Sequence, residues 1–449
     1  MTPCPRRFHV ETLGCPKNTV DSEKVVASLL ADGLVPAERA SDADLLVVNT
    51  CAFIEVAREE SIGVLLGLSG DRKEGAKLVA TGCMAERYGD ELAAAMPEAD
   101  AVVGFSGEGS LSQVMLRRAP DGVRDLLELA RPDPTAPWAY LKIAEGCDRE
   151  CAFCAIPSFR GRQRSRAPEA IEAEARSLVE RGVVEIVLVA QDLASYGRDA
   201  GESGALASLL RRLDTLSRDG LLRLRLLYLY PSEVRGALLD SMLGLETVVP
   251  YFDLSLQHAS GQLLRRMRRW GSGETFLALV DGIRSVRGDA AFRSSFISGF
   301  PGETETDHEE MLGFLRSARL DWAGFFPYSR EDGTVAAALD GEVPPGVVAE
   351  RLRELSEVQD PITAALRDAL VGELVEVLVD GPGDSEGGDR LGGRVGRTHR
   401  EAPEIDGVVH LGGAAPGAGT LVTARVTSAS GPDLEAVVVE PCGAERRAG

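Results

Sequence analysis

Hydrophobic positions in the first quarter of the chain alternate between short continuous apolar runs and segments with helical spacing. Runs such as ADLLVVNTC and AKLVATGC are typical of buried parallel strands. The segment DSEKVVASLLADGL has the spacing of an amphipathic helix. Residues 6–118 are therefore predicted to form a small parallel α/β unit. We expect strands at 6–15, 43–51, 76–83 and 99–105, with helices at 21–34, 56–68 and 86–96.

The same alternation returns after a proline-rich stretch, ARPDPTAPWAY, which favours extended chain. Six further apolar runs predict strands at 139–146, 183–191, 222–230, 251–258, 292–300 and 322–329. Helical spacing between them predicts helices at 168–182, 203–218, 232–244, 272–287 and 304–318. Six such units favour a partial (βα)6 TIM-like barrel over a flat doubly wound sheet, although the pattern alone leaves both open.

The last part of the chain has a different texture. A helical connector at 344–371 is expected to be interrupted by Pro361. Short β-like runs split by Gly, Pro and Asp follow, which predicts a small all-β barrel. The predicted divisions are thus 6–118, a linker at 119–138, 139–343, the connector, and 372–441.

Charge and hydropathy narrow the function classes. The 449 residues include 49 Lys and Arg against 70 Asp and Glu, a net charge of -21. Such an acidic surface argues against bulk nucleic-acid binding, although the charge could serve solubility alone. No apolar run is long enough to span a membrane, and the first ten residues lack the apolar core of a secretory signal, so we expect a cytoplasmic protein.

Eight cysteines in such a chain indicate metal or redox chemistry rather than a disulfide framework. Cys147, Cys151 and Cys154 have the spacing C-x3-C-x2-C directly after the first predicted barrel strand. Three soft thiolates suit iron–sulfur, zinc or copper(I). A structural zinc site needs a fourth ligand, which His258 could supply, although a satisfied polar residue at a strand end is the more expected role for it.

This cysteine spacing, with the aromatic Phe153 just before the last thiol, resembles the radical S-adenosylmethionine (SAM) superfamily. The resemblance implies a 4Fe–4S cluster whose open iron binds SAM, and a one-electron cleavage of SAM to a deoxyadenosyl radical. Two stretches at predicted strand ends, VAQDLASYGRD and FISGFPGETETD, resemble the SAM contacts of that superfamily. The implied contact residues are Gln191, Asp192, Tyr196, Ser298, Gly299, Pro301, Gly302 and Glu303.

A second set of cysteines closes three strands of the N-terminal unit. Cys15, Cys51 and Cys83 each end a predicted parallel strand. Because the carboxyl ends of parallel strands share one sheet edge, the three thiols should converge. Buried cysteines are common in strands, so chance is a possible explanation, but three from three at the same end favours a second iron–sulfur cluster with three protein ligands.

Two such clusters, a SAM barrel and a terminal β barrel resemble the methylthiotransferase family over almost the whole chain. The resemblance implies that 372–441 is an OB-like TRAM barrel and that the cofactors are two 4Fe–4S clusters and SAM. It implies that one SAM methylates a sulfur held at the N-terminal cluster and that a second SAM activates the substrate carbon. It also implies an electron donor such as flavodoxin or ferredoxin, whose identity the sequence does not show.

Two branches of that family differ in substrate: one modifies a tRNA adenosine, the other an aspartate of ribosomal protein S-twelve. The stretches GCPKNTVDSE, NTCAFIEVAREESI, LSLQHAS and YSREDGTVAA resemble the second branch. Over 372–440 there are 12 acidic residues and 5 arginines, a net charge of -7, which suits a basic ribosomal protein and makes tRNA an unlikely partner. The alternatives left open are the tRNA enzyme and a non-catalytic iron–sulfur electron carrier or redox sensor.

Two arginine clusters stand against the acidic background. Their members are Arg160, Arg162, Arg164 and Arg166, and Arg265, Arg266, Arg268 and Arg269. The expected role of both clusters is a solvated face. If one of these arginines lies near the site, it could instead pair with the carboxylate of the substrate aspartate.

Overall fold

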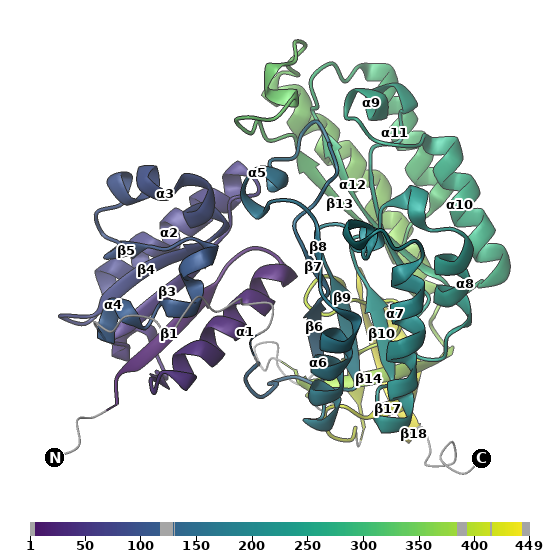
Figure 1. Cartoon of the computed structure of the whole chain (residues 1–449). Helices are drawn as coiled ribbons and strands as arrows, with labels where there is room; N and C mark the ends of the chain where they lie inside the picture. The colour runs from purple at the N-terminus through teal and green to yellow at the C-terminus, as the bar shows by residue number, and fades with distance from the viewer. Residues whose placement is uncertain (1–4, 117–128, 130, 384–392, 414, 442–449) are drawn as a thin grey trace.

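The computed structural model describes residues 5–116, 129, 131–383, 393–413 and 415–441. Figure 1 shows an N-terminal α/β unit in purple beside a larger central barrel in teal and green. The yellow strands of the C-terminal part lie at one end of that barrel. Most of the predicted linker at 119–138, together with Cys4 and Cys442, falls outside the described residues.

The N-terminal unit is a parallel sheet with the strand order β2-β1-β3-β4-β5. Its strands are β1 (Arg7–Thr12), β2 (Val35–Pro36), β3 (Leu45–Thr50), β4 (Lys77–Gly82) and β5 (Ala101–Val102). Its helices are α1 (Pro16–Ala31), α2 (Glu55–Asp71), α3 (Cys83–Ala95) and the short α4 (Gln113–Leu116). The predicted parallel α/β unit is confirmed. Helix α1 begins five residues earlier than predicted, because Pro16 has the fixed φ that suits a first helical position.

The central barrel contains all six predicted strands in chain order. They are β6 (Trp138–Lys142), β9 (Glu185–Val189), β10 (Arg223–Leu226), β11 (Tyr251–Gln257), β12 (Ala291–Ser298) and β13 (Trp322–Pro327). Two three-stranded parallel sheets are joined by the bridges Leu224 to Val248 and Leu229 to Leu254. The partial barrel is thereby confirmed over the flat sheet. The predicted helices appear as α6 (Pro168–Glu180), α7 (Ala205–Asp214), α8 (Gly236–Gly244), α10 (Gly273–Val286) and α11 (Glu305–Ala318).

The connector is one continuous helix, α12 (Pro345–Asp368), so the predicted interruption at Pro361 is wrong. Proline removes one backbone donor from the helix, but its neighbours tie this turn to the barrel. Gln359 donates to the carbonyl of Leu320 at 2.9 Å, and Thr363 donates to the carbonyl of Asp321 at 2.9 Å. These tertiary contacts hold the turn in place despite the lost backbone bond.

The C-terminal part is a closed barrel with the order β14-β15-β16-β18-β17, as predicted. Its strands are β14 (Leu374–Pro382), β15 (Arg394–Arg397), β16 (Val409–Gly412), β17 (Leu421–Ser430) and β18 (Asp433–Pro441). The segment 398–406, between β15 and β16, packs into the amino-terminal end of the central barrel. Tyr140 and Trp322 donate to backbone carbonyls of this segment, and the Tyr251 hydroxyl donates to Asp406 at 2.6 Å. This segment closes the end of the barrel opposite to the cysteines.

Candidate functional site

The three N-terminal cysteines meet at one edge of the first sheet. In the strand register Thr12 pairs with Asn49, and Thr50 pairs with Gly82, so β1, β3 and β4 end together. Cys15, Cys51 and Cys83, called the N-terminal trio below, follow these ends, and all three line one cavity of about 490 Å³. The topology therefore brings together thiols that are far apart in the sequence.

Cys147, Cys151 and Cys154, called the loop trio, line the same cavity from the barrel side. The loop that carries them is fixed by its backbone, since Cys154 donates to the Cys151 carbonyl at 3.1 Å and Ala152 donates to the Met267 carbonyl at 2.9 Å. Two donors point at its sulfurs: the backbone N–H of Arg149 lies 3.4 Å from Cys147 Sγ, and Arg269 Nη1 lies 3.4 Å from Cys151 Sγ. Such donors suit sulfur that carries negative charge.

Three of the six cysteines that line the cavity directly follow a glycine, a pattern on which none of the predictions above relied. Gly14, Gly82 and Gly146 have φ values of 95°, 85° and 77°. A Cβ at Gly14 would lie 2.9 Å from Cys51 Sγ, and one at Gly82 would lie 2.1 Å from Asn49 Oδ1. The repeated Gly-Cys pair therefore gives the backbone the left-handed turn that brings each cysteine to the cavity, and the pair was visible in the sequence.

The protonation of the thiols follows their surroundings. Burial raises the pKa of Cys51 and Cys154 to about 12 and that of Cys147 to about 11. Burial acts on Cys15 too, but the charges of Lys17 and Arg160 outweigh it and lower the pKa of that thiol. Metal binding must therefore displace protons from most of these thiols.

The donor set fits iron–sulfur clusters. Among the described residues, no group of three or more His, Cys, Asp or Glu side chains lies close enough together to hold a single metal ion. Cysteines that bind a 4Fe–4S cluster each ligate a different iron, so they need a wider spacing. The soft thiolates are spread over the wall of one cavity, which provides this wider spacing. Polar donors lie beside the sulfurs of the loop trio.

His258 does not join either trio. It follows the end of β11, where its Nδ1 accepts a hydrogen bond from the backbone N–H of Ser260 at 3.0 Å. Its side chain is buried, burial lowers its pKa to about 4, and it is absent from the residues that line the cavity. The geometry thus favours the satisfied polar role for His258 over a zinc ligand.

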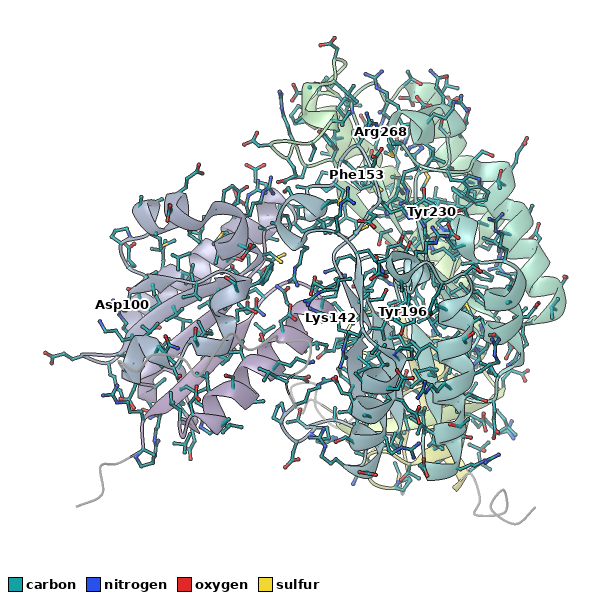
Figure 2. The ribbon with its side chains drawn as sticks, viewed as in Figure 1. Asp100, Lys142, Phe153, Tyr196, Tyr230 and Arg268 are labelled. Carbon is teal, nitrogen blue, oxygen red and sulfur yellow. The ribbon has the colours of Figure 1, made fainter. Side chains whose placement is uncertain are left out.

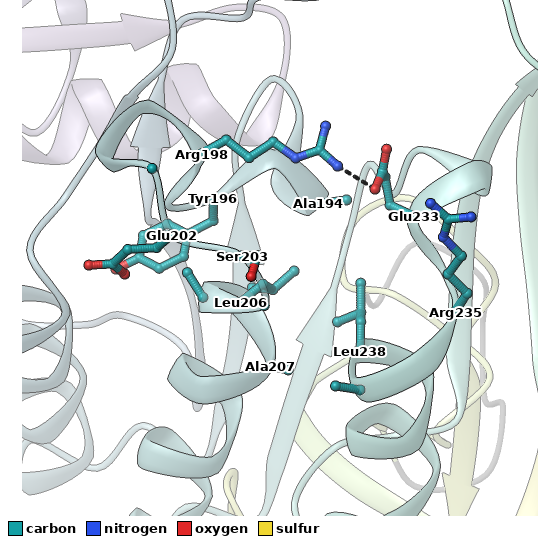
Figure 3. Close-up of a pocket in the computed structure, with 14 residues that line it drawn as sticks. Ala194, Tyr196, Arg198, Glu202, Ser203, Leu206, Ala207, Glu233, Arg235 and Leu238 are labelled. Atoms are coloured by element: carbon teal, nitrogen blue, oxygen red, sulfur yellow. Dashed lines mark hydrogen bonds and ion pairs between the residues drawn. The ribbon is translucent and has the colours of Figure 1, made fainter.

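The predicted SAM contacts are placed unevenly. Gln191 and Asp192 line the cavity with the cysteines. Tyr196 instead donates to the Arg166 carbonyl at 2.8 Å and lines a neighbouring pocket of about 540 Å³, with Arg198 and Glu233 paired at its edge (Figure 3). A role for Tyr196 in SAM binding stays a prediction.

The loop that holds Ser298, Gly299, Pro301, Gly302 and Glu303 is bonded within itself and to nearby backbone. The Gly299 N–H donates to the Glu303 carboxylate, and the Gly302 N–H donates to the Gly341 carbonyl at 2.6 Å. None of the five lines the cavity that holds the cysteines. Their role as SAM contacts also stays a prediction.

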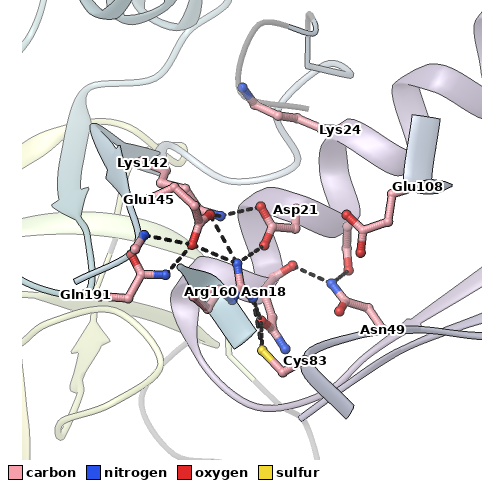
Figure 4. Close-up of polar contacts among 12 residues, drawn as sticks. Asn18, Asp21, Lys24, Asn49, Cys83, Glu108, Lys142, Glu145, Arg160 and Gln191 are labelled. Atoms are coloured by element: carbon pink, nitrogen blue, oxygen red, sulfur yellow. Dashed lines mark hydrogen bonds and ion pairs between the residues drawn. The ribbon is translucent and has the colours of Figure 1, made fainter. Parts of the chain in front are cut away.

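A buried charge network joins the N-terminal trio to the barrel (Figure 4). Arg160, on α5 (Ile156–Arg160) just after the loop trio, donates to Cys83 Sγ at 3.0 Å and to Asp21 at 2.9 Å. It also donates to both carboxylate oxygens of Glu145 at 3.1 Å. Lys142, which lies where the N-terminal unit meets the barrel (Figure 2), forms ion pairs with the same two acids. This network fixes the N-terminal unit against the barrel.

The expected solvated face is therefore wrong for part of the arginine clusters. Arg160, Arg166 and Arg269 are buried, whereas the other five are exposed. Arg166 pairs with Glu174 at 2.7 Å, and Arg269 lies over the Tyr230 ring at 4.0 Å. Their spacing could not distinguish these roles, because partners such as Asp21 and Tyr230 come from distant parts of the chain.

Further polar residues on the cavity wall were missed by sequence reasoning. Among them are Lys17, Tyr228, Asp253 and Arg293. Tyr228 and Gln257 have φ values of 62° and 73°, which a residue with a side chain adopts only under strain. Tyr228 is held there because its N–H donates to Asp253 at 2.9 Å, and Asp253 pairs with Arg293 at 3.2 Å. Polar residues inside the apolar run YFDLSLQ were the available signal.

Comparison with known proteins agrees with this geometry. Residues 7–104 match the uncharacterized protein family UPF0004, 141–315 match the radical SAM superfamily, and 371–439 match the TRAM domain. The ribosomal protein uS12 methylthiotransferase RimO of Saccharopolyspora erythraea is 44% identical, covering 98% of this chain and 96% of its own. The chain belongs to the uS12 methylthiotransferase family. The RimO protein of Moorella thermoacetica is 41% identical, covering 94% of this chain and 96% of its own.

Membership in the uS12 methylthiotransferase family makes this chain a radical SAM enzyme that uses SAM and an iron–sulfur cluster. A solved structure with a similar fold is the radical SAM methyltransferase TsrM of Kitasatospora setae, at 14% identity and a TM-score of 0.54. That likeness covers 74% of this chain and 77% of TsrM and shows the fold alone. Within the described residues, no helix is both long and apolar enough to cross a membrane.

Proposed function

We propose that this enzyme transfers a methylthio group to the β-carbon of an aspartate in ribosomal protein uS12. We also propose that it does so with two 4Fe–4S clusters, one on each cysteine trio. The observation that carries this proposal is that all six cysteines line one cavity. A cavity shared by two such sites can hold one substrate carbon between them.

The residues of the chain itself bind and orient the cofactors and the substrate, and they exclude water from the cavity. When bound, the clusters and SAM supply a radical that can take hydrogen from an unactivated carbon, which no amino-acid side chain can do. The thiolates hold the clusters, and Gln191 and Asp192 are proposed SAM contacts at the end of β9. Apolar side chains on the wall, Phe53, Ile156 and Phe326 among them, reduce the water that could quench a reactive intermediate.

The C-terminal barrel supports a protein substrate over tRNA. Three of its arginines are occupied by the chain itself: Arg397 pairs with Asp380 at 2.7 Å, Arg400 with Asp321 at 3.5 Å, and Arg425 donates to the Gly372 carbonyl. Phosphate contacts would need free cations there. The same proposal includes an electron donor such as flavodoxin or ferredoxin and a cytoplasmic location. It also includes the domain divisions at 6–118, 119–138, 139–343, 344–371 and 372–441.

Mass spectrometry of uS12 tests this function. Protein from cells that lack this gene should carry an unmodified aspartate, and the gene should restore the methylthio mass. A methylthio mass that persists on the aspartate without the gene would overturn the proposal. Digested tRNA from the same cells provides the control, since its methylthio-adenosine should not change.

A further inference from the structure

Lys17 occupies an unusual position in the cavity. It lies in the first turn of α1, two residues after Cys15, and its side chain lines the cavity that both trios share. Its residue exposure is only 9%, and its ammonium lies 3.5 Å from the centre of the Tyr228 ring on the barrel side. A lysine of the N-terminal unit thus reaches across to the barrel.

The other cations on the cavity wall have their donors in use. Arg149 pairs with Asp192 at 2.6 Å, Arg160 with Asp21 at 2.9 Å and Arg293 with Asp253 at 3.2 Å. Among the described residues Arg269 has no carboxylate partner, but it donates to the Ser255 carbonyl and towards Cys151 Sγ. These four side chains are therefore already paired with or bonded to other groups of the protein.

The ammonium of Lys17 differs, because none of its three donors is bonded to a residue that the structure describes. Its charge does act on the nearby Cys15 thiol, which is a proposed cluster ligand. An ammonium has three donors, and those of Lys17 face the cavity, since its Nζ is not among the buried unpartnered atoms of the described residues. Contact with the Tyr228 ring engages the charge but uses none of these donors in a hydrogen bond. The nearby acid Asp253 is already bonded to the Tyr228 N–H and to Arg293. The position therefore calls for an anion that comes from outside the chain.

We propose that Lys17 binds the side-chain carboxylate of the substrate aspartate. This inference rests on the proposed function and deepens it. In aspartate the carboxylate is attached directly to the β-carbon, so a cation that holds the carboxylate also fixes the carbon that receives sulfur. Lys17 lies beside Cys15, at the trio assigned to the sulfur donor, so the anchored carbon would face that trio.

The test measures how tightly the reconstituted enzyme binds uS12. It compares natural uS12 with a uS12 variant in which the target aspartate is changed to asparagine. Lys17→Met keeps the apolar stem and removes the charge, Lys17→Arg keeps the charge, and Lys73→Met is the matched control. Lys73 is a lysine of the same unit that pairs with Asp44 away from the cavity. Iron and sulfide are counted in every variant.

Lys17→Met should weaken binding of the aspartate form on the order of 10–100-fold, the loss typical of a charge-assisted bond. Lys17→Met should leave the binding of the asparagine form unchanged. Lys17→Arg should recover part of the loss for the aspartate form. The iron content should stay that of the wild type. Lys73→Met should bind both forms as the wild type does.

Equal loss for both forms, or no loss for either, overturns the inference. A loss of iron or sulfide in Lys17→Met also overturns it, because Lys17 would then serve the sulfur site rather than the substrate. Failure of the proposed function looks different: the wild-type enzyme itself would leave uS12 unmodified.

Discussion

The two cysteine trios reach the same cavity by different routes. The loop trio spans eight residues, Cys147 to Cys154, in the loop that follows β6, so its spacing is a local property of the chain. The N-terminal trio is spread over three strand ends and meets only because β1, β3 and β4 are neighbouring parallel strands. A local motif needs a correct loop, whereas a convergent site needs a correct sheet.

The electrostatic surroundings of the two regions also differ. Glu108, behind the N-terminal trio, is buried and accepts a hydrogen bond from Thr81 at 3.0 Å, and burial raises its pKa to about 8. Burial would also raise the pKa of Glu145 on the barrel side, but Lys142 and Arg160 outweigh it and lower that pKa. The N-terminal carboxyl is thus held neutral, while the barrel carboxylate is held charged.

The largest expected effect separates the trios by chemistry. Cys147→Ala should abolish deoxyadenosine formation from SAM, because the loop trio is the one that resembles the radical SAM site. Cys83→Ala should keep deoxyadenosine formation but abolish methylthio transfer. Chromatography of the nucleoside products and mass spectrometry of uS12 measure the two outcomes. Cys442→Ala, outside both trios, is the control, and equal behaviour of Cys83→Ala and Cys147→Ala would contradict the division of roles.

The next effect concerns the network between the N-terminal trio and the barrel. Arg160→Met leaves Asp21 and Glu145 to share Lys142 as their charged partner in a buried site, which should lower the free energy of unfolding by about 3–5 kcal/mol. Arg162→Met removes an exposed arginine two residues away and should change it by less than about 0.5 kcal/mol. Urea unfolding compares the two variants. Similar midpoints would show that the network does not hold the two regions together.

A smaller effect tests the sheet edge that the N-terminal trio needs. Gly82→Ala places a Cβ 2.1 Å from Asn49 Oδ1, whereas Gly33→Ala meets nothing within 4 Å at nearly the same φ, 84°. Both variants should lose about 1–2 kcal/mol to backbone strain, and Gly82→Ala should lose about 1–3 kcal/mol more to the collision. Thermal unfolding measures the difference. Equal losses would mean that the close approach at Gly82 is relieved without cost.

The smallest effect is a pH dependence. Because the pKa of Glu108 rises from 4.5 to about 8 on folding, the native state holds a proton that the unfolded state has released between these values. The free energy of unfolding should therefore fall as pH rises from about 4.5 to about 8. Glu108→Gln stays neutral, so it should gain stability relative to the wild type across this window.

Glu145→Gln provides the opposite control for that measurement. The lowered pKa of Glu145 adds stability above the pKa of the unfolded chain, so its replacement should destabilise the protein at neutral pH. Denaturant unfolding at several pH values follows both variants. A constant gap between Glu108→Gln and the wild type would contradict the protonated state assigned to Glu108.

Sequence patterns predicted most strands of all three parts, though not β2, and the meeting of Cys15, Cys51 and Cys83, because periodicity and parallel topology are regular. They did not predict that α12 continues through Pro361, since contacts of Gln359 and Thr363 with the barrel decide it. Nor did they predict the burial of Arg160 or the contact of the Lys17 ammonium with the Tyr228 ring. Those depend on partners from distant strands and helices, which no local spacing encodes.

An iron and sulfide count on anaerobically reconstituted protein tests the central claim most directly. If each trio holds a four-iron cluster, the wild type should contain about eight irons per chain, and Cys83→Ala and Cys147→Ala about four each. About four irons in the wild type, with the same number in Cys83→Ala, would mean that the N-terminal trio holds no cluster and would contradict the account.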